Sequence, residues 1–159
     1  MNDDLRDLYQ DLILDHGKRP RNFRVIPTAN HEALGHNPLC GDKISLYVST
    51  DDKGVIQDAA FQGSGCAISV ASASMMTEML KGKTVGQAET LFSDFHQVVT
   101  EGKANHAAEL SKLGKLSVLT GVCEYPARVK CATLAWHTMH NALSNQLSEI
   151  VATTDDEYE

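Results

Sequence analysis

The stretch ISLYVSTDDKGVIQDAAFQGSGCAIS (residues 44–69) determines the fold that we expect for this chain. Over residues 44–48 apolar side chains alternate with polar ones, which is typical of a strand with one buried face. Residues 51–54, Asp-Asp-Lys-Gly, supply turn-forming chemistry, and residues 55–62 predict a second strand. Two strands joined by such a turn form an antiparallel β-hairpin.

The glycines on either side of Ser64 predict a tight turn from this hairpin into a helix that ends at Gly82, with Cys66 at the exit of the turn. Four further segments have regular patterns: a helix with apolar residues over 5–13 that stops before Gly17, a short strand at 31–35, a helix that starts with the capping box Thr84–Gln87 and ends at Gly102, and a last helix that starts at Pro126. Residues 103–122 predict a helix interrupted near Gly114.

Strands that precede a series of helices indicate the α+β class, here a small antiparallel β-sheet of about three strands with helices packed on one face. A length of 159 residues suits one domain, which we expect over residues 1–147. Residues 148–159 form an acidic segment that we expect to be disordered.

Composition and charge exclude several classes of function. With 14 Lys+Arg against 21 Asp+Glu the net charge is −7, which argues against a nucleic-acid partner. The apolar stretches are shorter than the ~20 residues of a membrane span, so no membrane partner is expected. The first five residues are acidic where a signal peptide would be basic. These features predict a cytoplasmic protein.

Three of the four cysteines form a candidate metal site with an aspartate. Without an export signal, metal binding or thiol chemistry is expected in preference to disulfides. Cys40, Asp42, Cys66 and Cys131 would supply the four ligands that zinc commonly takes. The chain has no Cys-x-x-Cys pair, so the spacing alone leaves scattered buried cysteines as an equal alternative.

The expected positions of these cysteines add a physical argument. Cys66 and Cys131 are predicted in the first turns of helices, where the partial positive charge stabilises a thiolate. Cys40 is predicted on a loop, so it can leave a metal without unfolding a helix and is the candidate nucleophile. Three cations are candidates to offset the anionic site: Lys43, Arg128 and Lys130. The alternative for each is a solvated surface charge, which we favour for Lys43 and weigh evenly for Arg128.

Three segments together resemble the U-type iron–sulfur cluster assembly proteins (the IscU/NifU-like family): Asn-Pro-Leu-Cys-Gly-Asp at 37–42, Gly-Ser-Gly-Cys-Ala-Ile-Ser at 63–69 and Arg-Val-Lys-Cys at 128–131. The resemblance runs from about Leu8 to about Leu143 and implies a SufE/NifU-like fold. The family contains two classes, scaffolds on which a [2Fe–2S] cluster is built and SufU-type zinc-dependent sulfurtransferases.

Three departures from the scaffold pattern favour the SufU-type class. Scaffolds have histidine immediately before the last cysteine, whereas this chain has Lys130. Their Leu-Pro-Pro-Val-Lys chaperone motif is replaced by Tyr-Pro-Ala-Arg-Val at 125–129. Residues 102–122 resemble the insertion that SufU-type proteins carry before the last helix.

The resemblance implies that Cys40, Asp42, Cys66 and Cys131 bind Zn²⁺ and that Cys40 accepts persulfide sulfur from a SufS-type cysteine desulfurase. Arg128 matches an arginine near the site, and a SufBCD-type assembly complex would be the downstream partner. The alternatives are a [2Fe–2S] scaffold and a purely structural zinc domain. We interpret Cys123 as a spare thiol, and His137 and His140 as part of an exposed or partly buried helix face rather than as metal ligands.

Overall fold

A computed structural model describes residues 3–37, 41–101, 116, 119, 126–145 and 151–152 of the chain. The predicted interrupted helix, apart from the buried Leu116 and Leu119, lies outside the described residues, as do Cys40, Cys123 and the segment after residue 152.

The sheet contains three antiparallel strands, β1 (His31–Asn37), β2 (Asp42–Thr50) and β3 (Ile56–Ser64), and a two-residue strand, β4 (Val151–Ala152). Their order is β3-β2-β1-β4, and β4 pairs with β1 in parallel. The prediction of about three antiparallel strands is confirmed. β4 lies within the segment for which disorder was expected, and the domain limits at residue 147 stay a prediction.

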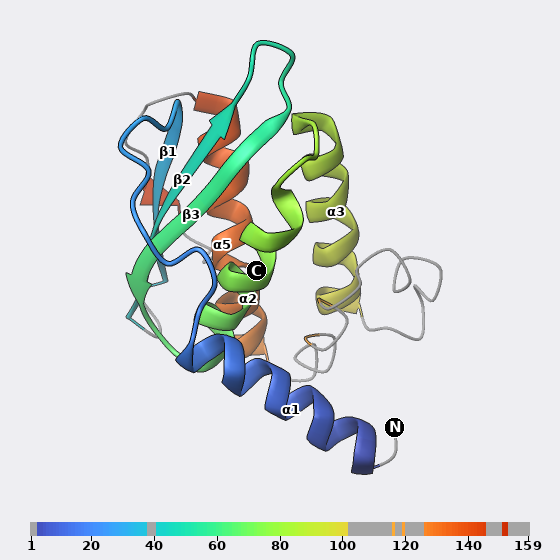
Figure 1. Cartoon of the computed structure of the whole chain (residues 1–159). Coiled ribbons are helices and arrows are strands. Elements are labelled where there is room, and N and C mark those ends of the chain that lie inside the picture. The colour runs from blue at the N-terminus through green and yellow to red at the C-terminus, as the bar shows by residue number, and fades with distance from the viewer. Residues whose placement is uncertain are drawn as a thin grey trace.

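In the part of the chain that the structure describes, four α-helices accompany the sheet: α1 (Asp3–Lys18), α2 (Ala67–Leu80), α3 (Val85–Glu101) and α5 (Pro126–Asn145). α2 and α5 pack on one face of the sheet, α3 packs against α5, and α1 crosses the end of α2 (Figure 1). This arrangement confirms the α+β class with helices on one face. None of the described helices has the length and apolar character that crossing a membrane requires.

Local hydrogen bonds explain why the predicted turns form. Oδ1 of Asp51 accepts bonds from the backbone N–H groups of Lys53 and Val55, which closes the β2–β3 hairpin. Thr84 and Gln87 form the expected capping box, since each backbone N–H donates to the side-chain oxygen of the other residue.

The end predicted for the first helix is wrong, because α1 continues through Gly17 to Lys18. A Cβ atom at position 17 would lie 3.3 Å from Cβ of Ala67, the first residue of α2. The missing side chain therefore allows α1 to approach α2 closely, so this glycine serves packing rather than termination.

A polar contact within the core joins α2 to α5. The hydroxyl of Ser72 donates to the carbonyl oxygen of Ala132 at 2.5 Å and accepts a bond from Nε1 of Trp136 at 3.1 Å. Trp136 is fully buried and its ring centre lies 5.0 Å from that of Phe95 on α3. Because the Ser72 hydroxyl and the Trp136 N–H are both hydrogen-bonded, the contact holds the two helices together without leaving a buried polar group unpaired.

Gly35 gives a direct test of the packing between the sheet and α5. A Cβ atom at position 35 of β1 would overlap Oγ1 of Thr138. We expect Gly35→Ala to lower the free energy of unfolding by about 1–3 kcal/mol, measured by urea denaturation. Thr138→Ala in the same chain should recover part of the loss.

Gly86→Ala is the matched control. Gly86 is an exposed residue of α3, and a Cβ atom there would meet nothing closer than 3.9 Å. It should leave stability unchanged or raise it slightly. Equal losses at the two glycines would contradict the packing argument.

Candidate metal centre

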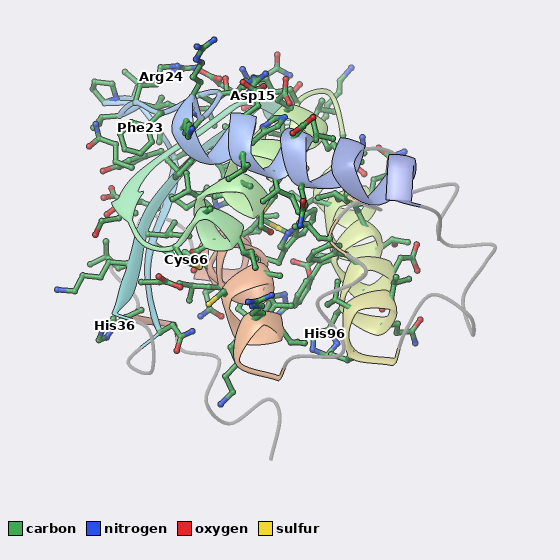
Figure 2. All side chains as sticks on the ribbon, turned by 90° about the horizontal axis from the view of Figure 1, so that it is seen from below. Asp15, Phe23, Arg24, His36, Cys66 and His96 are labelled. Atoms are coloured by element: carbon green, nitrogen blue, oxygen red, sulfur yellow. The ribbon has the colours of Figure 1, made fainter. Side chains whose placement is uncertain are left out.

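Asp42, Cys66 and Cys131 converge at one end of the sheet, although they are far apart in the sequence. Asp42 is the first residue of β2, Cys66 is the N-cap of α2 and Cys131 lies on α5. One donor atom from each lies within 4.8 Å of the other two. Figure 2 shows Cys66 at the start of α2, beside α5. Three of the four predicted ligands therefore meet.

Asp42 holds the turn before α2 in place. Its side chain is fully buried, and Oδ1 accepts a hydrogen bond of 3.0 Å from the backbone N–H of Cys66. A Cβ atom on Gly65 would lie 2.5 Å from the same Oδ1 atom, so this approach requires glycine at position 65. The other oxygen, Oδ2, lies 3.9 Å from Sγ of Cys66.

The surroundings of Cys66 favour its thiolate. The side-chain hydrogen bond from Cys131 is the largest cause that lowers the pKa of Cys66 to about 6, and the backbone N–H groups of Ser69 and Ile68 act in the same direction. Burial and the charge of Asp42 oppose them. The Ser69 N–H group lies 3.4 Å from Sγ and belongs to the first turn of α2, as expected for a helix N-terminus.

Cys131 differs from its prediction. It is the sixth residue of α5 and so lies in the second turn, beyond the backbone N–H groups that the first turn leaves unpaired. Cys131 is also buried, whereas Cys66 is exposed. The helix-terminus argument therefore applies to Cys66 and not to Cys131.

The three candidate cations are sequence neighbours of the ligands, and the structure shows how exposed their side chains are. Lys43 follows Asp42 on β2 with an exposed side chain, and the Lys130 side chain is half-buried next to Cys131. The Arg128 side chain is exposed on the first turn of α5. Their roles toward an anionic site stay a prediction.

Sequence reasoning missed how the loop before Asp42 is closed. The backbone N–H of Gly41 donates to the carbonyl oxygen of Asn37 at 2.8 Å, and Asn37 pairs directly with Asp42. Gly41 has a φ of 72°, a conformation that favours glycine. The glycine after Cys40 was the available signal, because it marks a turn that leads directly into β2.

The donor set fits zinc. Thiolate sulfur and carboxylate oxygen are both accepted zinc ligands, and in a tetrahedral site these two atoms are separated by roughly 3.6 Å. The distance of 3.9 Å between Sγ of Cys66 and Oδ2 of Asp42 lies close to that value. The three described donors need one more ligand to complete a tetrahedron.

Comparison with known proteins agrees with this geometry. The sequence model of the NifU-like N-terminal domain matches residues 8–148. The chain is similar to the zinc-dependent sulfurtransferase SufU of Bacillus subtilis, with 37% identity over 91% of this chain and 95% of that protein. It is also similar to the iron–sulfur cluster assembly scaffold protein IscU of Streptococcus pyogenes, with 41% identity over 87% of this chain and 84% of that protein.

A solved structure supports the same assignment. The crystal structure of a SUF-system protein from Fervidobacterium islandicum, described as an iron–sulfur cluster assembly scaffold, superposes with a TM-score of 0.76. The two proteins are 32% identical, over 87% of this chain and 98% of that chain. The chain belongs to the NifU-like N-terminal domain family, and its resemblance to the U-type iron–sulfur cluster assembly proteins is confirmed.

Substitutions of Asp42 should separate its structural role from ligation. Asp42→Ala removes both the charge and the acceptor for the Cys66 N–H group, so we expect the metal-free protein to lose about 1–3 kcal/mol of unfolding free energy. Asp42→Asn keeps an acceptor oxygen, so it should weaken zinc binding with a smaller loss of stability. Urea denaturation and zinc content per chain measure the two effects.

Asp52→Ala is the control for loss of a carboxylate, because Asp52 is exposed in the hairpin turn. It should change neither quantity. If Asp42→Ala weakened zinc binding but left the stability of the metal-free protein intact, the structural role of the hydrogen bond would be refuted.

Proposed function

We propose that this protein is a zinc-dependent sulfurtransferase that accepts persulfide sulfur from a SufS-type cysteine desulfurase and passes it to the iron–sulfur cluster assembly machinery. The observation that carries the proposal is the convergence of Asp42, Cys66 and Cys131 into one set of zinc-type donors. The similarity to the Bacillus subtilis sulfurtransferase supports it.

Asp42, Cys66 and Cys131 would hold the zinc ion, with Cys40 as the fourth ligand. The covalent chain supports this choice, since the Cα atoms of two residues that are two positions apart lie within about 7 Å of each other. Cys40 precedes Asp42 by two positions, in the connection between β1 and β2. Bound zinc would keep its cysteine ligands deprotonated near neutral pH and limit their oxidation.

The transfer step is a thiol–persulfide exchange. The thiolate of Cys40 attacks the outer sulfur of the persulfide on the desulfurase, a new sulfur–sulfur bond forms at Cys40, and the sulfur–sulfur bond of the donor breaks. The donor cysteine leaves as a thiolate, so no external oxidant or reductant is needed. Cys40 suits this role because Cys66 caps α2 and Cys131 lies within α5, whereas the sequence places Cys40 between the end of β1 and the start of β2.

Arg128 would help to bind the desulfurase or balance the charge of the transferred sulfur. Its exposed position on the first turn of α5, three residues before Cys131, leaves the guanidinium group accessible from outside the site. Guanidinium groups suit interfaces of this kind because they are less strongly hydrated than ammonium groups.

The surroundings that we propose follow from this reaction. The desulfurase is the upstream partner, a SufBCD-type complex is the downstream partner, and the reaction takes place in the cytoplasm. The net charge of −7 is consistent with protein partners rather than nucleic acid.

Alanine formation by the desulfurase tests the proposal. The zinc-loaded protein should stimulate the turnover of a SufS-type desulfurase by at least about tenfold, since an acceptor removes the persulfide that blocks the next cycle. Cys40→Ala should abolish this stimulation. Cys123→Ala, which also removes one thiol, should retain it.

Persulfide labelling followed by mass spectrometry locates the sulfur in the same reactions. The additional sulfur should be found on Cys40. Stimulation that survives Cys40→Ala, or additional sulfur on Cys123 alone, would overturn the assignment of the acceptor.

A second candidate function is that of a scaffold for a [2Fe–2S] cluster, which would be cargo built on the same cysteines. The Streptococcus pyogenes relative, named as such a scaffold, favours it, and cysteine thiolates are the ordinary ligands of these clusters. Lys130 argues against it, because scaffolds have histidine at this position. Under anaerobic reconstitution, a stable visible-absorption spectrum of a [2Fe–2S] cluster that transfers to an acceptor, without stimulation of the desulfurase, would favour the scaffold.

A further inference from the structure

The facing sides of α3 and α5 form a cavity that the proposed sulfur transfer does not use. It has a volume of about 510 Å³ and is open to solvent. Three histidines and a glutamate line it, together with the ring of Phe92: His96 and Glu89 on α3, and His137 and His140 on α5. His96 lies on the side of α3 that faces α5 (Figure 2).

His137 contributes a buried nitrogen with no hydrogen-bond partner in the described part of the chain. The residue is 9% exposed, and its Nε2 atom is fully buried. Burial, followed by the neighbouring imidazoles of His96 and His140, lowers the pKa of His137 to about 4. At neutral pH the ring is therefore uncharged, which is the form of histidine that binds metal ions.

His140 is arranged like a histidine that binds a metal. Its Nδ1 atom lies 2.7 Å from Oε2 of Glu89, the contact through which a carboxylate orients a metal-binding imidazole. When Nδ1 carries the proton in this bond, the lone pair lies on Nε2. The side chains of His140 and Glu89 are 48% and 33% exposed, so the bonded pair can shift together toward an ion in the cavity.

The spacing of His96 and His137 also suits a shared ion. Their ring centres are 5.7 Å apart, and two imidazoles that bind one zinc-sized ion have ring centres roughly 5 Å apart. Among the described residues, only Asp42, Cys66 and Cys131 already have three donor atoms within 4.8 Å of one another. Movement of the exposed His140 would complete a site, which predicts weaker and more exchangeable binding than at the thiol site.

We propose that the cavity between α3 and α5 is a second metal site, which binds a divalent transition-metal ion through His96, His137 and His140, with Glu89 orienting His140. Imidazole ligands favour ions such as Zn²⁺, Ni²⁺ and Cu²⁺ over Mg²⁺ and Ca²⁺. His137 follows Cys131 by six residues, which is about 9 Å along the helix axis, so this site is separate from the thiol site. The proposal goes beyond our interpretation of His137 and His140, which gave them no metal role.

Nickel binding to the full chain tests this proposal. The protein, without an affinity tag, is dialysed against micromolar free Ni²⁺, and both nickel and zinc per chain are then measured by elemental analysis. We expect one nickel per chain with no loss of zinc. Absence of bound nickel, or release of zinc equal to the nickel gained, would overturn the proposal.

Variants of the cluster show where the ion binds. His140→Gln removes an exposed ligand and should lower nickel affinity by at least about tenfold, and Glu89→Gln, which removes no ligand, by about 10–100-fold. His96→Gln combined with His137→Gln should abolish binding. His36→Gln removes one histidine from β1, outside the cavity, and should bind nickel as the unmodified chain does.

Circular dichroism of each variant confirms that it is folded. The half-buried position 89 and the exposed position 140 keep the test valid if the substitution at the buried His137 prevents folding. Nickel affinity that is unchanged in both His140→Gln and Glu89→Gln would refute the site. An equal loss in His36→Gln would show that the binding is not located in the cavity.

Discussion

The hydrogen bond from the backbone N–H of Cys66 to Asp42 joins the start of β2 to the start of α2, and the thiol site depends on it. It satisfies a backbone donor at the helix N-terminus and brings a carboxylate next to a thiol. The buried carboxylate can approach this closely because residue 65 has no side chain. One contact therefore sets both the direction in which α2 leaves the sheet and the separation of two donor atoms.

Helix α5 connects the sheet and α2 on one side with α3 on the other. In its first half α5 contributes Cys131, and the carbonyl of Ala132 and the indole N–H of Trp136 bond to the Ser72 hydroxyl of α2. Toward its end, the carbonyl of Ala142 lies 3.0 Å from Nδ1 of His31 on β1. The cavity with the three histidines lies on the side of α5 that faces α3. Because α5 packs against both the sheet and α3, it keeps the thiol site and the histidine cavity at a fixed separation.

Features that depend on neighbouring residues were predictable from the sequence. Alternating apolar residues and the turn at 51–54 correctly predicted the β2–β3 hairpin, and the Thr84–Gln87 box correctly predicted the start of α3. Residue types and spacing left the grouping of Asp42, Cys66 and Cys131 open against scattered buried cysteines, and the resemblance to the family implied it. Roles that arise from contacts between distant segments were not predictable from the sequence. Gly17 had the pattern of a helix end, yet it serves the contact with Ala67, and the histidine cavity exists only once α3 and α5 pack together.

β3 and β1, the outer two of the three antiparallel strands, are hydrogen-bonded to other segments of the same chain. On β3, Phe61 exchanges backbone hydrogen bonds with Asn22 and Arg24, and Phe23 packs edge-on against the ring of Phe61. On the other side, β4 pairs with Leu34 and Gly35 of β1. An unpaired edge strand can template the pairing of another chain and so lead to aggregation. At these positions the backbone groups of β3 and β1 are already paired within the chain, so a second chain cannot pair with them there.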